Sequence, residues 1–153
     1  MSYTIVGLGN PGEEYKTTRH NAGRILLERF RKKNDFPEWT EEKKHGKKVE
    51  FLISKGKVGK HAVTLILPEL FMNKSGASIK SLVASSAGGG TSKKKAEQLV
   101  VVYDDVDLGF SDHKISFGRG SGGHNGIESI IKSIKTKDFV RVRVGISPTT
   151  PGG

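Results

Sequence analysis

Cysteine is absent from all 153 residues of the chain. Disulfides, thiolate zinc sites and cysteine nucleophiles are therefore excluded. The sequence also has no apolar run approaching the ~18 residues of a membrane-spanning helix, and its N-terminus lacks the basic and apolar regions of a signal peptide. We therefore expect a cytoplasmic protein without a membrane partner.

Acidic residues are outnumbered, with 16 Asp and Glu against 26 Lys and Arg, which gives a formal charge of +10. A basic chain of this kind favours a polyanionic partner such as nucleic acid, although a generally basic, solvated surface gives the same balance. Two common hydrolase motifs, G-x-S-x-G and H-E-x-x-H, are missing as well.

Strand and helix patterns alternate along the chain. Short β-prone runs predict strands, and apolar residues at helical spacing predict helices between them. The expected strands are residues 3–6, 49–54, 62–67, 99–103, 114–117 and 140–146, and the expected helices are residues 21–33, 74–85 and a helix carrying Ile127, Ile130, Ile131 and Ile134. Residues 34–48 are expected to be a loop, and residues 55–59 a hairpin turn. The pattern predicts one α/β domain over residues 1–153, a three-layer α/β/α sandwich around a central mixed twisted sheet.

Two glycine-rich segments, residues 7–12 and 118–123, match G-x-G-x-x-G. Neither is followed by the strand-end acid that a dinucleotide-binding site requires: after the first segment Glu28 falls in the middle of a predicted helix, and no such acid follows the second. The second segment does precede a helix. It could therefore offer backbone N–H groups and a positive helix end to a phosphate.

Acidic residues and histidines supply the candidate chemistry. Asp104, Asp105 and Asp107 follow the most apolar strand, where active sites of α/β sheets gather; they could hold Mg²⁺ or be solvated loop acids. His20 and His124 each precede an asparagine at a predicted helix start. Either could act in catalysis or be a satisfied surface residue.

Five motifs resemble one family in content and order. They are residues 7–12 with Tyr15 and Thr-Arg-His-Asn-Ala-Gly at 18–23, Phe-Met-Asn-Lys-Ser-Gly at 71–76, Asp-Asp-Val-Asp-Leu at 104–108, Gly-Gly-His-Asn-Gly at 122–126, and the strand at 141–146. Together they resemble the bacterial peptidyl-tRNA hydrolases over nearly the whole chain.

The resemblance implies hydrolysis of the ester between a peptide, or an N-blocked aminoacyl group, and the 3′ end of tRNA, without metal or cofactor. His20 matches the family's general base, and imidazole has a suitable pKa for that task. Asp104 matches the residue that holds the imidazole in one tautomer. Asn10, Asn73 and Asn125 match the asparagines of the site, where amides can donate to peptide carbonyls or the oxyanion without ionising.

Other positions keep two interpretations. Tyr15 matches a residue near the tRNA terminus or packs in a loop, and Met72 lines the pocket or fills the core. Asn21 caps a helix, contacts the tRNA 3′ end, or does both. His124 is expected to build the helix start rather than to catalyse. On the tRNA side, Arg143 matches an arginine for the 5′ phosphate, with Lys114 and Arg119 as supporting cations.

Two features depart from the family pattern. Relatives commonly continue about 30–40 residues past the last strand, so we expect the domain to lack the family's C-terminal helical segment. Ser116 stands where a second basic residue is common. The resemblance favours a monomeric enzyme. The alternatives are a non-catalytic RNA-binding relative of the same fold, and a nucleotide-binding or metal-dependent phosphoryl enzyme based on the glycine loops and the acidic run.

Overall fold

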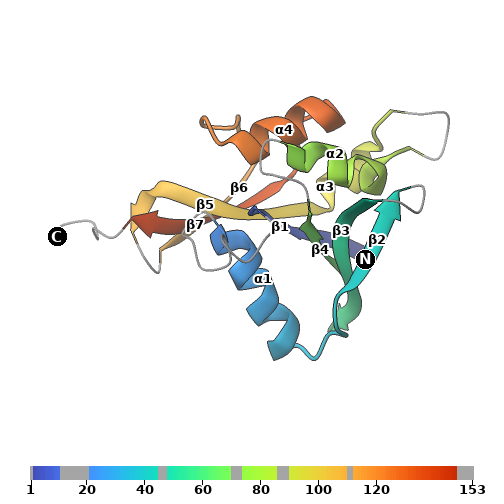
Figure 1. Ribbon diagram of the computed structural model, residues 1–153. Coiled ribbons are helices and arrows are strands. Elements are labelled where there is room, and N and C mark those ends of the chain that lie inside the picture. Colours follow the sequence, from blue (N-terminus) through green and yellow to red (C-terminus); the bar gives the residue numbers. More distant parts are fainter. Residues whose placement is uncertain are drawn as a thin grey trace.

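The computed structural model describes residues 2–10, 21–44, 48–69, 74–85, 90–109 and 112–147. These residues form strands and helices in alternation (Figure 1). The strands are β1 (Ser2–Gly7), β2 (Thr40–Lys44), β3 (Lys48–Val58), β4 (His61–Pro68), β5 (Leu99–Gly109), β6 (His113–Phe117) and β7 (Val140–Ser147). The helices are α1 (Ala22–Lys33), α2 (Ser75–Ile79), the 3₁₀ helix η4 (Lys80–Val83), α3 (Lys93–Glu97) and α4 (Asn125–Ile134).

The strands form one mixed, seven-stranded sheet in the order β2-β3-β4-β1-β5-β7-β6. The four central strands, β4, β1, β5 and β7, run parallel to one another. The outer strands are antiparallel to their neighbours: β3 to β4, β2 to β3, and β6 to β7. The carboxyl ends of the parallel strands therefore meet at one edge of the sheet, which is where ligand sites of such sheets form.

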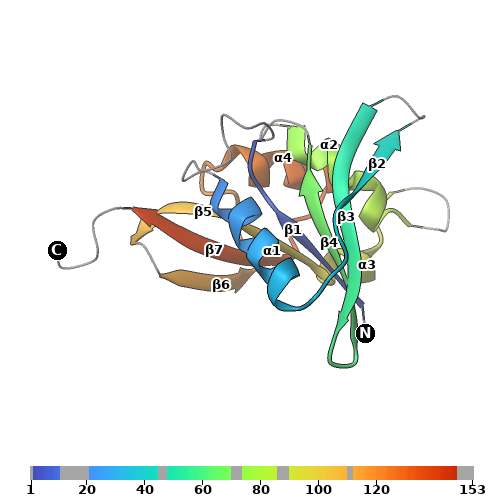
Figure 2. The same ribbon diagram turned by 60° about the horizontal axis from the view of Figure 1, so that its bottom comes forward.

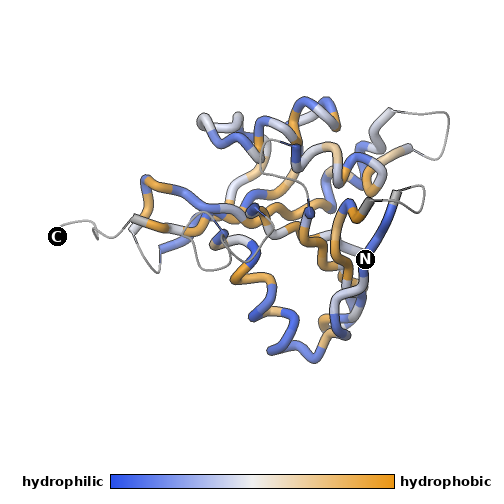
Figure 3. The backbone as a smooth tube through the Cα atoms, viewed as in Figure 1, coloured by the Kyte–Doolittle hydropathy of each residue, from blue (hydrophilic) through white to orange (hydrophobic). Residues whose placement is uncertain are grey.

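Helices cover both faces of the sheet, as the sequence pattern predicts. Helix α1 lies on one face, and α2, α3 and α4 lie on the other (Figures 1 and 2). One apolar core joins α4 to β1 and β5, with Val6, Val101 and Ile130 among its members, and a second core packs Leu27 of α1 against Leu65. Hydrophobic residues accordingly concentrate in the central strands, whereas along the helices hydrophobic and hydrophilic residues alternate (Figure 3). The predicted three-layer α/β/α sandwich is confirmed.

The segment predicted as a loop, residues 34–48, contains the edge strand β2, so that prediction is wrong. Its sequence, Thr-Glu-Glu-Lys-Lys, has no apolar alternation, and its backbone pairs with β3. Charged side chains on an edge strand hinder pairing with other chains, and they also remove the hydrophobic signal. The turn between β3 and β4 is also shifted, because β3 runs to Val58. The turn falls at Gly59, whose φ of 59° favours glycine.

Helical structure differs from the prediction in two places. The helix expected over residues 74–85 is α-helical only over α2 and continues as the 3₁₀ helix η4. The lysine-rich segment that follows is not among the expected helices, yet it forms the short helix α3. Ser92 caps α3, since its side chain accepts a hydrogen bond from the Lys95 N–H at 3.2 Å.

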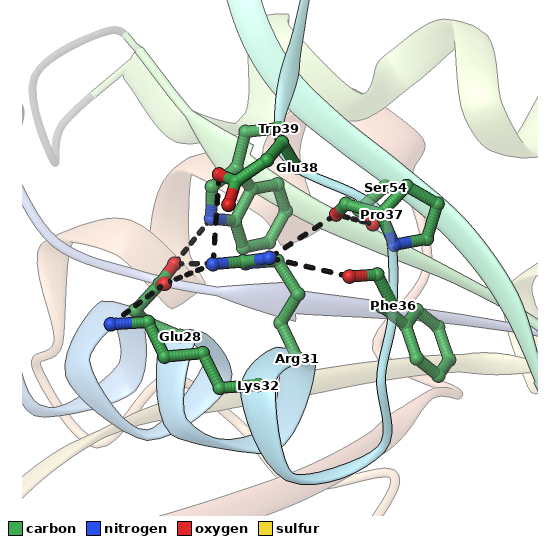
Figure 4. A network of polar contacts seen from close by, with 8 residues as sticks. All are labelled: Glu28, Arg31, Lys32, Phe36, Pro37, Glu38, Trp39 and Ser54. Carbon is green, nitrogen blue, oxygen red and sulfur yellow. Dashed lines mark hydrogen bonds and ion pairs between the residues drawn. The ribbon is translucent and has the colours of Figure 1, made fainter.

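A buried arginine fixes the chain after α1. Arg31 is 5% exposed; it donates to Glu28 at 2.6 Å and to the carbonyls of Phe36 and Pro37 at 3.3 and 3.4 Å. Trp39 donates to the same Glu28 carboxylate. The network also includes Lys32, Glu38 and Ser54 (Figure 4). It joins the end of α1 to the approach to β2 and to strand β3.

The opposite edge strand, β6, exposes apolar side chains. Ile115 is 68% exposed and Phe117 is 51% exposed. They lie opposite Val142 and Val140 of β7 in the ladder, so all four share one face of the sheet. This end of the sheet therefore presents an apolar strip to solvent.

Candidate active site

A pocket of about 610 Å³ opens between the ends of β1 and β5, the glycine-rich loop and the start of α4. Six of the predicted site residues line it: Asn10, Asp104, Arg119, His124, Asn125 and Arg143. The other lining residues are Tyr103, Asp105, Val106, Asp107, Gly120, Ser121, Gly122 and Gly123. The sequence motifs around residues 10, 104, 119–125 and 143 thus converge on one place.

The sequence pattern predicted a strand that ends at residue 103, before the acidic run. Strand β5 does not end there. It continues through Asp104 and Asp105 to Gly109, with a shift in its register to β7 after Asp105. Asp104 is 5% exposed, whereas Asp107 is exposed. The acids are therefore not an equivalent cluster, because the backbone sends Asp104 into the protein and Asp107 toward solvent.

His124 connects the start of α4 to Asp104. Its Nδ1 accepts hydrogen bonds from the backbone N–H groups of Gly126 and Ile127, at 3.1 and 3.2 Å. Nδ1 therefore carries no proton, and in the neutral ring the proton sits on Nε2. Nε2 donates it to Asp104 Oδ1 at 2.8 Å. In this arrangement His124 is the N-cap of α4 and a donor to Asp104, not a base.

The same bonds correct one expectation about the glycine-rich loop. Residues 118–123 do precede a helix, but the amides of Gly126 and Ile127 at the helix start are occupied by the His124 ring. The Tyr103 ring packs edge-on against that imidazole, with ring centroids 4.9 Å apart. These two amides are therefore bonded to His124 rather than available to a phosphate.

Asn21 joins the end of the β1 segment to the start of α1. Its Oδ1 accepts from the Asn10 N–H at 2.9 Å, and its Nδ2 donates to the Asn10 carbonyl at 2.8 Å. Asn21 occupies the predicted N-cap position but makes no capping hydrogen bond, and it is 2% exposed. Gly23 lets α1 approach the sheet here, since a Cβ at this position would lie 2.2 Å from the Val102 carbonyl oxygen. The Asn-Ala-Gly run thus positions Asn10.

Four predicted site residues, Tyr15, His20, Met72 and Asn73, lie outside the described residues. The described residues on either side of residues 70–73 are anchored to helices α1 and α4. Arg24 in α1 pairs with Glu69 at 2.8 Å, just before residues 70–73. The Gly76 N–H, just after them, donates to Ser129 of α4 at 2.9 Å.

The predicted tRNA-contacting residues differ in their surroundings. Arg119 and Lys114 are exposed, and Lys114 lies beside Arg143 in the β6–β7 ladder. Arg143 is only 14% exposed in its side chain and forms an ion pair with Asp105, with Nη1 and Oδ2 3.1 Å apart. Ser116 pairs with Arg141 in the same ladder.

Arg141 is a residue whose importance the sequence pattern did not reveal. It is 0% exposed, and its guanidinium donates to the carbonyls of Gly120 at 3.2 Å, Lys137 at 2.9 Å and Arg119. The Phe139 ring lies 4.0 Å from its Cζ. Arg141 therefore fixes the glycine-rich loop that forms one wall of the pocket. The sequence signal that could have indicated its burial is the alternation of valine and arginine over residues 140–144, because β7 lies between two other strands.

Burial moves two pKa values around Arg141. Desolvation lowers the pKa of Arg141 from its ordinary value, and a hydrogen bond with Tyr103 partly opposes this. Desolvation likewise raises the pKa of the Tyr103 hydroxyl, against the effect of the neighbouring arginines. Tyr103 stays protonated at neutral pH as a result, and the charge of Arg141 remains beneath the pocket wall.

Among the described residues, no group of three or more His, Asp or Glu side chains is arranged to hold a metal ion. Nor does any helix in the described part of the chain have the length and apolar character needed to cross a membrane. A larger hollow of about 1100 Å³ lies at the C-terminal end of α4, bordered by Phe51, Leu82 and Ile134, and it includes none of the predicted site residues.

Comparison with known proteins identifies the family. The sequence model of the family described as peptidyl-tRNA hydrolase matches residues 4–152. A peptidyl-tRNA hydrolase of Thermodesulfovibrio yellowstonii is 38% identical over 152 residues, 93% of this chain and 70% of that protein. One from Brevibacillus brevis is 36% identical over 148 residues, 97% of this chain and 72% of that protein.

The fold agrees as well. The crystal structure of peptidyl-tRNA hydrolase from Acinetobacter baumannii superposes with a TM-score of 0.77 at 33% identity, covering 99% of this chain and 70% of that one. An α/β protein with these motifs around one pocket is a hydrolase of this type. The chain belongs to the peptidyl-tRNA hydrolase family.

Proposed function

We propose that this chain hydrolyses the ester bond that joins a peptide, or an N-blocked aminoacyl group, to the 3′ end of tRNA, which recycles the tRNA of prematurely released peptidyl-tRNA. The observation that carries the proposal is the pocket itself. Asn10, Asp104 and the pair His124–Asn125 come from three separate motifs, and the fold brings all four residues to its wall.

His20 acts as the general base in this proposal. It would take a proton from the attacking water, and Asp104 would hold its imidazole in the required tautomer. The fixed position of Asp104 supports this role, because its Oδ1 already accepts from His124 and the side chain is only 5% exposed. His20 directly precedes Asn21, whose side chain is bonded to Asn10 on the pocket wall.

The asparagines bind the peptide end of the substrate. Asn125 is exposed at the start of α4 and lines the pocket, and Asn10 is held from behind by Asn21. Their neutral amides can donate to peptide carbonyls and to the negative charge that develops on the ester carbonyl oxygen. Asn73 and Met72 complete this part of the site, and Tyr15 stacks near the terminal nucleotide.

The basic residues bind the tRNA acceptor end. Arg143 and Arg119 line the pocket, and Lys114 lies beside Arg143 on the neighbouring strand. Arginine suits a phosphate because its planar fork can donate two hydrogen bonds. We further propose that the protein works in the cytoplasm as a monomer, and that residues 1–153 act as one domain without a metal or cofactor.

The test is cleavage of an N-blocked aminoacyl-tRNA in the presence of EDTA. We expect the parent chain to release free tRNA and His20→Ala to lose at least ~100-fold in rate, the usual contribution of a general base. His61→Ala is the matched control, because His61 is exposed at the start of β4 and its ring contacts Tyr3, away from the pocket. Its rate should stay within about twofold of the parent.

Each other outcome has a distinct meaning. A folded parent that binds tRNA without cutting it favours the non-catalytic RNA-binding alternative. Loss of activity in EDTA favours a metal-dependent phosphoryl or ester chemistry instead. Full activity of His20→Ala would exclude His20 as the base and leave the substrate assignment standing.

A further inference from the structure

One of the two arginines that line the pocket already has an acidic partner. Arg143 and Asp105 both line the pocket and form an ion pair with Nη1 and Oδ2 3.1 Å apart. Their side chains are only 14% and 12% exposed. The Nε of Arg143 is buried and has no hydrogen-bond partner among the described residues. Asp105 is therefore the one carboxylate in the described part of the chain that neutralises this guanidinium.

The carboxylate of Asp105 is held independently of the arginine. Its Oδ1 accepts a hydrogen bond from the Asp107 N–H at 2.8 Å, which leaves Oδ2 directed at Arg143. Arg143 is likewise positioned by its own strand, since it lies opposite Tyr103 in the β5–β7 ladder and beside Lys114 in the β6–β7 ladder. Neither partner depends on the ion pair alone for its place.

A phosphate that binds Arg143 must compete with this internal carboxylate. Asp105 already holds Nη1, so a phosphate that binds this nitrogen must displace the carboxylate, and a partly buried cation interacts strongly with whichever anion is present. The ion pair has no net charge. The pocket wall of the free protein is therefore less positive toward a polyanion than Arg143 and Arg119 alone would make it.

We propose that Asp105 is a built-in counter-ion that sets the affinity of the pocket for a terminal phosphate of the tRNA. This inference rests on the proposed function, in which Arg143 faces the tRNA end. Asp105 holds Arg143 in the free protein, the phosphate takes its place in the complex, and Asp105 recovers the arginine when the tRNA product leaves. It therefore keeps product binding weak.

The experiment measures binding of deacylated tRNA with a 5′ phosphate and of the same tRNA with a 5′ hydroxyl. Asp105→Asn keeps an amide oxygen for the Asp107 N–H but removes the charge. We expect it to bind the phosphorylated tRNA about fivefold more tightly, near the upper end for ion pairs close to a surface, and the hydroxyl form within about twofold of the parent. The gain should vanish when Arg143 is also changed to Ala.

The matched control is Asp107→Asn, which removes one negative charge from the same pocket wall. Asp107 is exposed and forms no ion pair among the described residues. A gain in Asp107→Asn equal to that in Asp105→Asn, or an equal gain for both tRNAs, would reduce the effect to net charge and overturn the proposal. Weaker binding by Asp105→Asn would overturn it too, since Asp105 would then only support Arg143.

A second measurement separates this proposal from the proposed function. Inorganic phosphate should raise the Tm of Asp105→Asn more than that of the parent, because the released arginine binds the anion. This test uses neither tRNA nor catalysis. If the parent fails to bind or cut tRNA, the proposed function fails. If phosphate raises the Tm of both proteins equally, the counter-ion role of Asp105 is rejected whatever the tRNA experiments show.

Discussion

Two buried arginines, Arg31 and Arg141, each fix an irregular segment, and the two segments lie in different regions of the molecule. Arg31, at the end of α1, and Arg141, in β7, are 5% and 0% exposed, and each donates to backbone carbonyls of a segment without regular structure. Arg31 also binds the carboxylate of Glu28. Arg141 forms no ion pair with any described carboxylate and relies on carbonyls, Phe139 and Tyr103.

The pKa values record the difference. The hydrogen bond that Arg31 donates to Glu28 raises the pKa of Arg31, whereas desolvation lowers the pKa of Arg141. A buried cation without a counter-ion is costly, so the fold must gain something from it. Arg141 lies behind the glycine-rich loop of the pocket, and Arg31 lies about 14 Å along α1 from the helix start. Arg141, which has no carboxylate partner among the described residues, is the arginine that lies behind the pocket wall.

The largest effect is expected from Arg141→Met. This change leaves the carbonyls of Arg119, Gly120 and Lys137 without their buried donor, and we expect a loss of about 3 kcal/mol in the free energy of unfolding. The loosened loop should also reduce kcat/KM about tenfold. Urea unfolding and ester cleavage measure the two effects.

Arg141→Lys serves as the companion variant, because it keeps the charge but not the planar fork. It should fall between the parent and Arg141→Met in both measurements. Unchanged activity of the folded fraction of Arg141→Met would contradict the claim that this arginine positions the pocket wall.

The same substitution at the other arginine, Arg31→Met, should cost about 2 kcal/mol of stability, since two carbonyls and Glu28 lose their partner. We expect kcat/KM of the folded protein to stay within about twofold of the parent, because the network of Figure 4 does not reach the pocket. A loss of activity comparable to that of Arg141→Met would erase the distinction between the two regions.

The smallest effect is expected from Glu28→Gln, and it depends on pH. Burial opposes ionisation of Glu28, but hydrogen bonds from Arg31 and Trp39 and the charge of Lys32 lower its pKa below 4.5 overall. A lowered carboxyl pKa stabilises the fold above pH 4.5, and this contribution disappears as the pH falls through the lowered value. The variant should be about 0.5 kcal/mol less stable than the parent at pH 7. The difference should shrink in acid unfolding curves; a constant difference would contradict the assigned charge.

The strong periodic signals predicted most of the sheet and the helices. The isoleucine repeat of α4 and the apolar run of β5 carry their own burial pattern, so local sequence was sufficient. The charged strand β2 and the lysine-rich helix α3 carry no such pattern. They form because β3 supplies a backbone partner and Ser92 supplies a cap. The motifs also predicted six residues that line the pocket, but the motifs did not predict the hydrogen-bond partners of these residues.

The sequence by itself determined the family, the α/β class and the residue types that the chemistry requires, because motifs and periodicity are local properties of the chain. Only the tertiary structure decided how those residues pair. His124 binds Asp104 across 20 positions of sequence, Arg143 binds Asp105 across 38, and Arg141 is buried with no ion pair to a carboxylate of the described residues. Such pairs depend on strand register and on which face of the sheet is covered, and these are set by packing between distant segments.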